Sequence, residues 1–237
     1  MVLTMKTLCL ATILLSTSAL QINSVDGDAC TCLRWKDAYT NYNMTCDEGE
    51  EFCGGFFLHM SGNICVNQGM GSGKKAEQYC FVSPACQQLN GGGHISDKIA
   101  MKVCTAADER LVDKTPEEIE ALSVKDDLDR GLVVKMAYPI LPKTRWSIAK
   151  AYLTGDFTSG RAKLTSDQTN ELSAIGRSGK TAVIDSNSGH PPFAVVAGSR
   201  VYEIKLQMGN LIKLVGGGKQ VFEHPSQLTY MTCVSDC

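Results

Sequence analysis

The sequence lacks the motifs by which most catalytic sites are recognised. It contains no GxSxG nucleophile elbow and no HExxH zinc motif. Two glycine-rich stretches, 69–74 and 176–181, end like phosphate loops, but Gln68 and Ala174 occupy the place of the first required glycine. Asp185-Ser186-Asn187 lacks the glycine of an aspartic-protease triplet. These absences favour a non-enzymatic protein, although a catalytic triad is assembled in space and leaves no contiguous signature.

Histidine and clustered positive charge are also scarce. The four histidines are scattered and are expected on the surface or in turns: His59, His94, His190 and His224. With 23 basic against 25 acidic residues, the chain does not favour nucleic acid or an anionic membrane as its main partner. After the N-terminal leader, no apolar run approaches the roughly 20 residues that a transmembrane helix needs. The last residues, 234–237, form no apolar tail for a lipid anchor.

An apolar leader opens the chain. Lys6 precedes an apolar run over 7–15, and Thr17 and Ala19 place small residues at the positions required for cleavage after Ala19. The run is too short to span a bilayer, so an uncleaved anchor or a buried helix is the weaker interpretation. We expect residues 1–19 to be a signal peptide and the mature chain to be secreted or to stay in the lumen of the secretory pathway.

Cysteine is abundant where catalytic motifs are missing. Of the 11 cysteines, Cys9 leaves with the leader. An even set remains, which in an exported chain predicts full pairing into disulfides. The predicted disulfide cysteines are Cys30, Cys32, Cys46, Cys53, Cys65, Cys80, Cys86, Cys104, Cys233 and Cys237.

The spacing of these cysteines restricts their pairing only in part. Eight cysteines allow 105 connectivities. Cys30 and Cys32 are expected to reach separate distant partners, and Cys233 and Cys237 to bond to each other or to tie the tail to the first part of the chain. The secreted setting and the absence of paired CxxC knuckles favour bridges over zinc, so no metal and no cofactor are predicted.

Residues 26–104 are expected to form a cysteine-rich module. Its many glycines separate short apolar runs, which predicts short strands and loops without helices. Asn43 opens an Asn-Met-Thr glycosylation sequon. An acidic stretch over 47–51 is expected to be a solvated loop, with calcium binding as the alternative. Six aromatic residues are expected to form the core, with a binding surface as the alternative: Trp35, Tyr39, Tyr42, Phe52, Phe56 and Phe57.

Residues 105–140 are expected to form a charged helical connector. Thr115-Pro116-Glu117-Glu118 is a good helix start, because threonine caps, proline fits the first turn and the two acids favour the positive end of the helix dipole. Ile119 and Leu122 then give a partial apolar stripe. Gly131 is the predicted stop, and an extended stretch is expected from Leu132 to the residue before Pro139.

Residues 141–237 are expected to form an α+β module. A short helix is predicted over 146–153, and Thr165 and Gln168 form a capping box that opens a second helix ending at Gly176. Strand-like runs follow, separated by turn-rich segments, which predicts an antiparallel meander or a small barrel. These runs are 181–184, 193–197, 200–206, 211–215 and 220–223.

One resemblance covers the first third of the chain. The segments that carry it are 30–35 (CTCLRW), 79–86 (YCFVSPAC), 89–92 (LNGG) and 102–104 (KVC). Together they resemble a cysteine-rich module of uncharacterised secreted proteins of dinoflagellate-type microalgae. This resemblance implies secretion and disulfides, and it implies no activity and no site residues.

The sequence therefore predicts an α+β protein with a disulfide-rich N-terminal module. The leading function is a non-enzymatic binding or structural protein of the cell surface, the extracellular space or a larger assembly, with a protein or glycan partner. One alternative is a secreted hydrolase in the C-terminal module, where His190 or His224 would approach Asp185 or Glu223. The other alternative is an accessory subunit of an organellar complex reached through the secretory route.

Overall fold

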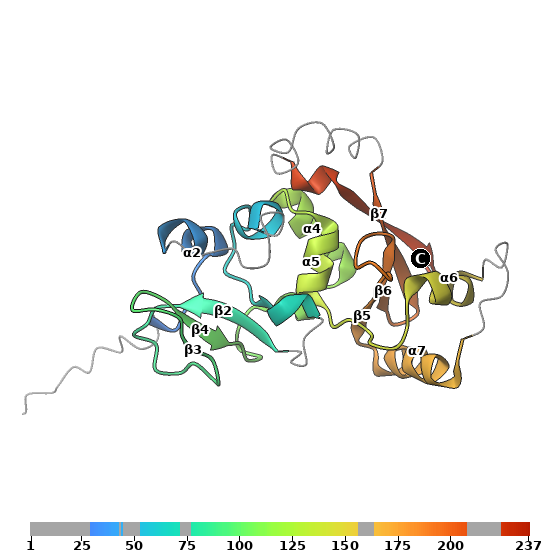
Figure 1. Cartoon of the computed structure of the whole chain (residues 1–237), viewed down its shortest axis with the longest axis horizontal. Coiled ribbons are helices and arrows are strands. Elements are labelled where there is room, and N and C mark those ends of the chain that lie inside the picture. The colour runs from blue at the N-terminus through green and yellow to red at the C-terminus, as the bar shows by residue number, and fades with distance from the viewer. Residues whose placement is uncertain (1–28, 43, 45–52, 72–76, 156–163, 208–223) are drawn as a thin grey trace, which may run out of the picture.

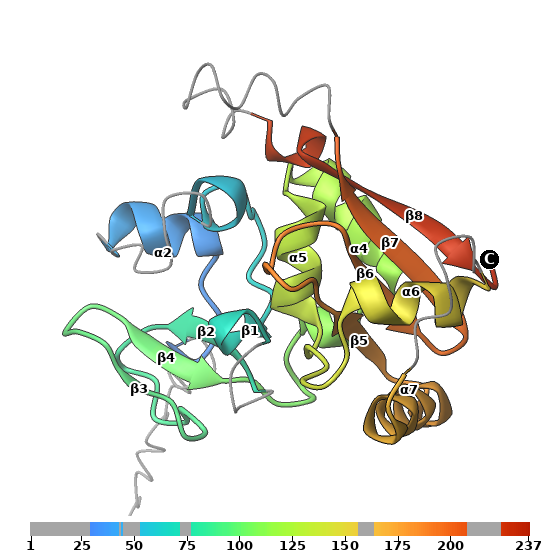
Figure 2. The same ribbon diagram turned by 45° about the vertical axis from the view of Figure 1, so that its right-hand side comes forward.

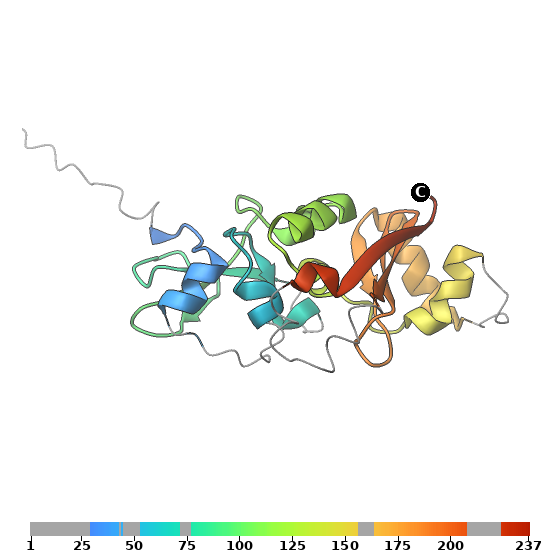
Figure 3. The same ribbon diagram turned by 90° about the horizontal axis from the view of Figure 1, so that it is seen from above.

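The fold is taken from a computed structural model that describes residues 29–42, 44, 53–71, 77–155, 164–207 and 224–237 (Figure 1). Helices and two antiparallel four-stranded sheets make up the α+β fold that the sequence predicts. The cysteine-rich sheet, helices α4 (Pro116–Lys125) and α5 (Arg130–Ala137), and the C-terminal sheet follow one another along the long axis (Figures 2 and 3). None of the helices in these ranges is long and apolar enough to cross a membrane.

The first sheet has one aromatic face and one face rich in sulfur. Its strands are, in spatial order, β1 (Val66–Asn67), β2 (Gln78–Val82), β4 (Ala100–Val103) and β3 (Gly93–His94). Successive side chains on a strand point to opposite faces. In β2, Tyr79 and Phe81 join the main hydrophobic core, whereas Cys80 and Val82 pack in a second cluster made largely of cysteines. We call this second side the sulfur face.

The prediction that residues 26–104 contain no helix is wrong. Helix α2 (Trp35–Asn41) buries Trp35 and Ala38, and a short π-helix spans Cys53–Phe57. Both segments are too short for a helical period to be read from the sequence. Burial of their aromatic side chains against the sheet stabilises them, since isolated helices of this length are unstable in water.

The expected aromatic core is confirmed for the described rings. Trp35, Phe56 and Phe57 are each at most 1 % exposed. The Trp35 ring lies 4.9 Å from Phe57 and 5.1 Å from Phe81, and its indole N–H donates to the carbonyl of Ile64 at 2.7 Å. Phe52, the acidic stretch 47–51 and Asn43 lie outside the described residues.

Helix α4 begins as predicted. The Glu118 N–H donates to the Thr115 hydroxyl at 3.3 Å, and the Glu118 carboxylate accepts the Thr115 N–H at 2.7 Å. This reciprocal pair is a capping box, and Ile119 is buried one turn later. The helix start is therefore determined by local chemistry that the sequence displays.

Gly131 does not end a helix, contrary to the prediction. It lies in the first turn of α5, whose N-cap is Asp129, and 132–134 are helical where an extended stretch was expected. A Cβ at position 131 would lie 2.9 Å from the Asp129 carboxyl and 3.5 Å from the Phe193 ring. Crowding at a helix start and a left-handed helix end both favour glycine, so the residue alone does not distinguish them.

Helix α5 joins the two sheets. At its C-terminal end, the Gln78 side-chain amide donates to the carbonyl of Ala137 at 3.0 Å, and the Asn67 amide donates to that of Lys135 at 3.3 Å. These bonds satisfy carbonyls that a helix end leaves without intrahelical partners. On its other side, the Lys135 ammonium pairs with Asp185 at 2.9 Å and lies over the Phe193 ring of the second sheet.

Helices α6 (Trp146–Thr154) and α7 (Ser166–Ser178) lie where the sequence predicts them. Thr165 and Gln168 form the expected capping box. Helix α7 continues past Gly176, which corrects the predicted end, and stops at Gly179, whose φ is 64°. The stretch 176–181 therefore joins a helix to a strand, the reverse of the strand–loop–helix order of a phosphate loop.

The second sheet is an antiparallel meander, as expected. Its strands are β5 (Thr181–Ile184), β6 (Phe193–Ala197), β7 (Arg200–Leu206) and β8 (Thr229–Ser235), in that spatial order. The first three have the predicted bounds, whereas β8 was missed. The predicted strands 211–215 and 220–223 lie outside the described residues. Gly198, with φ 64°, supplies the positive φ that a two-residue hairpin turn requires.

Candidate functional site: a polar cavity above a sulfur cluster

A cavity of about 510 Å³ opens on the sulfur face of the first sheet. Its volume lies within the range of small-molecule sites in proteins. Its wall combines side-chain amides, one ammonium, two carboxylates and the chain around the first two bridged cysteines. The lining residues are Cys30, Thr31, Cys32, Asn63, Gln87, Gln88, Lys102, Ala107, Asp108 and Glu109.

Lys102 and Asp108 form an ion pair in this wall. The Lys102 side chain is 8 % exposed, and its ammonium donates to Asp108 at 2.7 Å and to the carbonyl of Cys30 at 2.9 Å. Asp108 also accepts the Thr105 N–H at 2.8 Å. Burial raises the pKa of Asp108, but the hydrogen bonds from Lys102 and Thr105 outweigh it and hold the pKa below its ordinary value. The pair is therefore an ionised, preorganised feature of the cavity wall.

The chemistry of the wall suits a polar ligand. Asn63, Gln87 and Gln88 offer exposed amides, each with both donors and an acceptor, and Glu109 offers a carboxylate. No aromatic ring is among the described lining residues, so a sugar or base stacked on a ring is not supported there. The cavity can bind a ligand through hydrogen bonds to hydroxyl, amide or amine groups.

A second cavity, of about 290 Å³, shares Asn63 and Glu109 with the first. It lies against helix α4 and has a more apolar wall that includes Met60, Ile64 and Leu122. The shared residues make the two cavities neighbours on one surface. A ligand larger than the first cavity can therefore extend into the second cavity, towards α4.

Beneath the first cavity lie the bridges of the sulfur face. The cysteines join as Cys30–Cys86, Cys32–Cys80 and Cys65–Cys104, and a further bridge joins Cys233 to Cys237. Cys30 and Cys32 thus take separate distant partners, and the two C-terminal cysteines bond to each other. The expected disulfides are present in the N-terminal part of the chain. Cys46 and the side chain of Cys53 lie outside the described residues.

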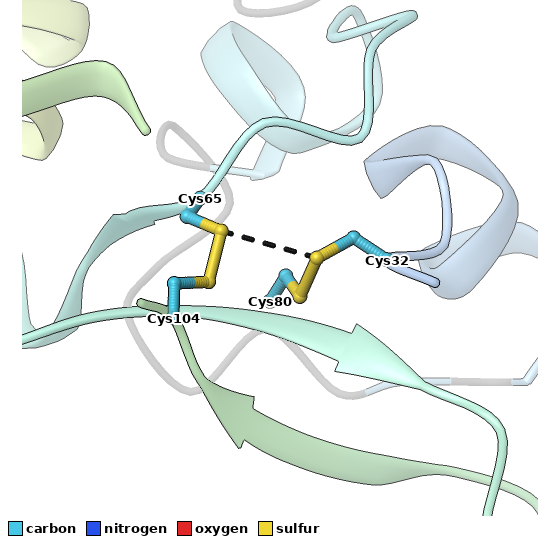
Figure 4. A group of neighbouring side chains, drawn as sticks. All are labelled: Cys32, Cys65, Cys80 and Cys104. Atoms are coloured by element: carbon cyan, nitrogen blue, oxygen red, sulfur yellow. Dashed lines mark hydrogen bonds between the residues drawn. A yellow bond between two sulfur atoms is a disulfide. The ribbon is translucent and has the colours of Figure 1, made fainter. Parts of the chain in front are cut away.

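Two of these bridges lie against each other (Figure 4). The Sγ atoms of Cys32, Cys65, Cys80 and Cys104 all lie within 4.8 Å of one another. The Sγ atoms of Cys32 and Cys65, which belong to different bridges, are 3.9 Å apart. Because disulfide sulfurs carry no hydrogen, this approach is a van der Waals contact between bridges.

Among the described residues, Asp185 and the two histidines of the hydrolase hypothesis have other surroundings than that hypothesis predicts. Asp185 pairs with Lys135, and the ring of His190 is exposed without a partner among the described residues. The His224 ring lies 3.3 Å from Asp127, a residue of the connector, and Glu223 lies outside the described residues.

Ser226 completes this cluster but does not make it a catalytic triad. Its hydroxyl donates to the Asp127 carboxylate, which also accepts the Ser226 N–H at 3.1 Å. Burial raises the pKa of Asp127, but these bonds and that from His224 outweigh it, so the pKa lies below its ordinary value. In a Ser-His-Asp triad the serine hydroxyl bonds to the imidazole, whereas here the hydroxyl and the imidazole both lie against the carboxylate.

Comparison with known proteins adds no assignment, because no protein-family model, curated protein or solved structure matches the chain. The cavity and the sulfur cluster are therefore the features of the chain that bear on its function.

Most residues of the cavity wall were not predicted from the sequence. The sequence singled out Cys30 and Cys32, but gave no role to Lys102, Asp108 or the amides at the rim. One local signal was available: Lys102 alternates with the two apolar residues beside it in a strand, which places a charge on the buried sulfur face. Its pairing with the carbonyl of Cys30, 72 residues earlier, had no local signal.

Proposed function

We propose that the mature chain is a secreted or lumenal, non-enzymatic binding protein whose ligand occupies the polar cavity of the cysteine-rich part. The single observation that supports this function most strongly is the cavity of about 510 Å³ with the part-buried Lys102–Asp108 ion pair in its wall. The disulfides are compatible with an extracellular or lumenal protein, since such bonds persist in oxidising compartments.

The chemistry of the cavity favours a hydroxyl-rich ligand, of which a glycan is the class proposed. Amide side chains at the rim can donate to and accept from neighbouring hydroxyls, and the ionised pair provides charge-assisted hydrogen bonds. The amide side chains at the rim are exposed, whereas Lys102 and Asp108 in the wall are already bonded to each other and, through Lys102, to the Cys30 carbonyl. Binding therefore requires no rearrangement of the core.

The test uses the whole chain without residues 1–19, because the hydrophobic core is continuous from Trp35 to Ile204 and no part is shown to fold alone. A glycan array identifies a ligand, and calorimetry measures its affinity. The variant N63A/Q87A/Q88A removes three amides from the rim and is expected to weaken binding at least tenfold. The variant N170A changes an exposed amide on α7 and is expected to bind like the natural chain.

Two results would contradict the proposal. One is a ligand whose affinity is the same for N63A/Q87A/Q88A and for N170A. The other is release of a cleaved product from the bound ligand, which would indicate a hydrolase.

A further inference from the structure

We propose that Cys32, Cys65, Cys80 and Cys104 form a sulfur centre with two states: two disulfides in the oxidised chain and one tetrahedral zinc site in the reduced chain. The proposal goes beyond ligand binding in the cavity and does not depend on it. The residues come from four separate segments, with no CxxC pair, so the sequence spacing of a zinc motif is absent.

The four Sγ atoms lie at nearly the separations that a zinc site requires. A zinc ion bonded tetrahedrally to four thiolates at about 2.3 Å holds its sulfurs about 3.8 Å apart. Here the four Sγ atoms all lie within 4.8 Å of one another, and two from different bridges are 3.9 Å apart. Four freed sulfurs would therefore start close to the separations that one zinc ion requires.

The backbone holds these positions without the bridges. Cys80 lies in the centre of β2 and pairs with Lys102 of β4. Cys65 donates to the carbonyl of Glu109 at 2.8 Å and accepts from Leu111 at 2.9 Å. Cys104 donates to the carbonyl of Gln78 at 2.8 Å, and Leu33, next to Cys32, donates to that of Phe81 at 2.7 Å. A preformed site of this kind favours metal binding, because the ligands need not be gathered.

A reductant and a metal ion can reach the four cysteines from the polar cavity. Cys65 and Cys80 are buried, but Cys32 and Cys104 are partly exposed, and Cys32 lines the polar cavity. A small dithiol can therefore attack the Cys32–Cys80 bridge from the cavity, and a metal ion can enter by the same route. Lys102 lies opposite Cys80 on β4 and places a positive charge on the face where four thiolates would gather.

The chemistry balances with a dithiol as the reductant. Two dithiol molecules donate four electrons and four protons, which break the two disulfides and give four cysteine thiols and two cyclic disulfides. One Zn²⁺ then displaces four protons and forms four Zn–S bonds. In the reverse direction, two external disulfides accept four electrons and, with four protons from solvent, leave as four thiols, while the two bridges re-form and Zn²⁺ departs.

Cobalt(II) is the probe for this site, because it takes the same tetrahedral geometry as zinc and is coloured. The whole mature chain is reduced with excess dithiol without oxygen, freed of the reductant and titrated with Co²⁺. The expected result is one Co²⁺ per chain with the strong visible bands of a tetrahedral thiolate complex, and their loss when Zn²⁺ is added.

Variants separate this centre from the other cysteines. C104A removes one ligand and is expected to weaken Co²⁺ binding at least about tenfold, the lower limit seen even for outer-shell changes. C30A/C86A, C46A/C53A and C233A/C237A leave the four ligands intact and are expected to bind like the natural chain. Circular dichroism of each reduced chain, with and without metal, shows whether a variant is folded.

Three results would overturn the proposal. The first is no tetrahedral cobalt spectrum in the reduced natural chain. The second is unchanged binding in C104A and in C65A, which provides a second variant should C104A fail to fold. The third is loss of the spectrum in C46A/C53A or C233A/C237A while circular dichroism shows that the variant is folded.

Discussion

Asp129 shows how one buried side chain depends on both local and distant structure. It caps α5 by accepting the Leu132 N–H at 2.9 Å, and Thr229 of β8 donates to the same carboxyl. Burial raises the pKa of Asp129 to about 6 from 3.8, more than the hydrogen bonds from Leu132, Gly131 and Thr229 lower it. The cap joins residues three positions apart, whereas the hydrogen bond from Thr229 comes from β8.

The raised pKa predicts how stability varies with pH. Below pH 3.8 Asp129 is protonated in both states, and between 3.8 and about 6 only the unfolded chain releases the proton. The free energy of unfolding therefore loses about 3 kcal/mol from this group as the pH rises through that window. The substitution D129N keeps a residue that can cap the helix and removes the carboxyl that titrates.

Urea unfolding of both proteins between pH 3 and 8 measures this effect. The stability of the natural chain relative to D129N is expected to rise by about 3 kcal/mol from pH 7 to pH 3.5. Taking the difference cancels the titration of the other carboxyls. A difference that stays constant with pH would contradict the assignment.

At the level of elements, the sequence predicts those whose signals are local. The capping boxes at Thr115 and Thr165 satisfy their own helix starts, and strands 181–184, 193–197 and 200–206 carry β-branched and aromatic residues between turn signals. Helix α2 depends on packing against remote residues, and the start of α5 combines its local cap, Asp129, with a bond from Gly131 to the remote Thr229. Their local sequences are ambiguous, and both were predicted wrongly.

The link between α5 and the first sheet gives a prediction for these elements. The amide of Gln78 donates to Ala137 and to Asn67, each at 3.0 Å, and its carbonyl accepts the Val112 N–H at 3.1 Å. Q78A leaves these buried groups without partners and is expected to cost about 2 kcal/mol or more. In N67A/Q78A the cost is expected to be smaller than the sum of the single changes, because the two residues share a bond.

Urea unfolding of the oxidised chain measures all three variants. Q87A, at an exposed glutamine of the cavity rim, is the control and is expected to stay within about 0.5 kcal/mol of the natural chain. If Q78A is as stable as Q87A, the amide link does not support α5.

At the level of the whole molecule, the bridges are expected to differ in their effect on stability. Cys30–Cys86 joins residues 56 apart, whereas Cys233–Cys237 joins residues 4 apart. By the loop-entropy relation, removal of the long bridge costs about 4 kcal/mol and removal of the short one about 2 kcal/mol.

Thermal and urea unfolding of C30A/C86A and C233A/C237A test this order. Peptide mapping without reduction first confirms which cysteines are joined in each protein. A larger loss in C233A/C237A than in C30A/C86A would show that native-state contacts, and not loop closure, dominate.

Only part of the candidate site could be predicted from the sequence. Cys30 and Cys32 were singled out from the sequence, because cysteine is recognisable by its chemistry alone. The Lys102–Asp108 pair, the amide rim and the gathering of four sulfurs were not foreseen, since they bring together segments that are far apart in the chain.

By itself the sequence determined the α+β class, the capped helix starts, three strands and the richness in cysteine, because these depend on residues a few positions apart. Only the tertiary structure decided which cysteines pair, that two bridges touch, and that a polar cavity lies above them. Apart from the Cys233–Cys237 bridge, the bridges and the contacts between Cys32 and Cys65 and between Lys102 and Cys30 join residues 33 to 72 positions apart. Contacts of that separation are selected by burial and sheet register of the whole chain, which no local pattern records.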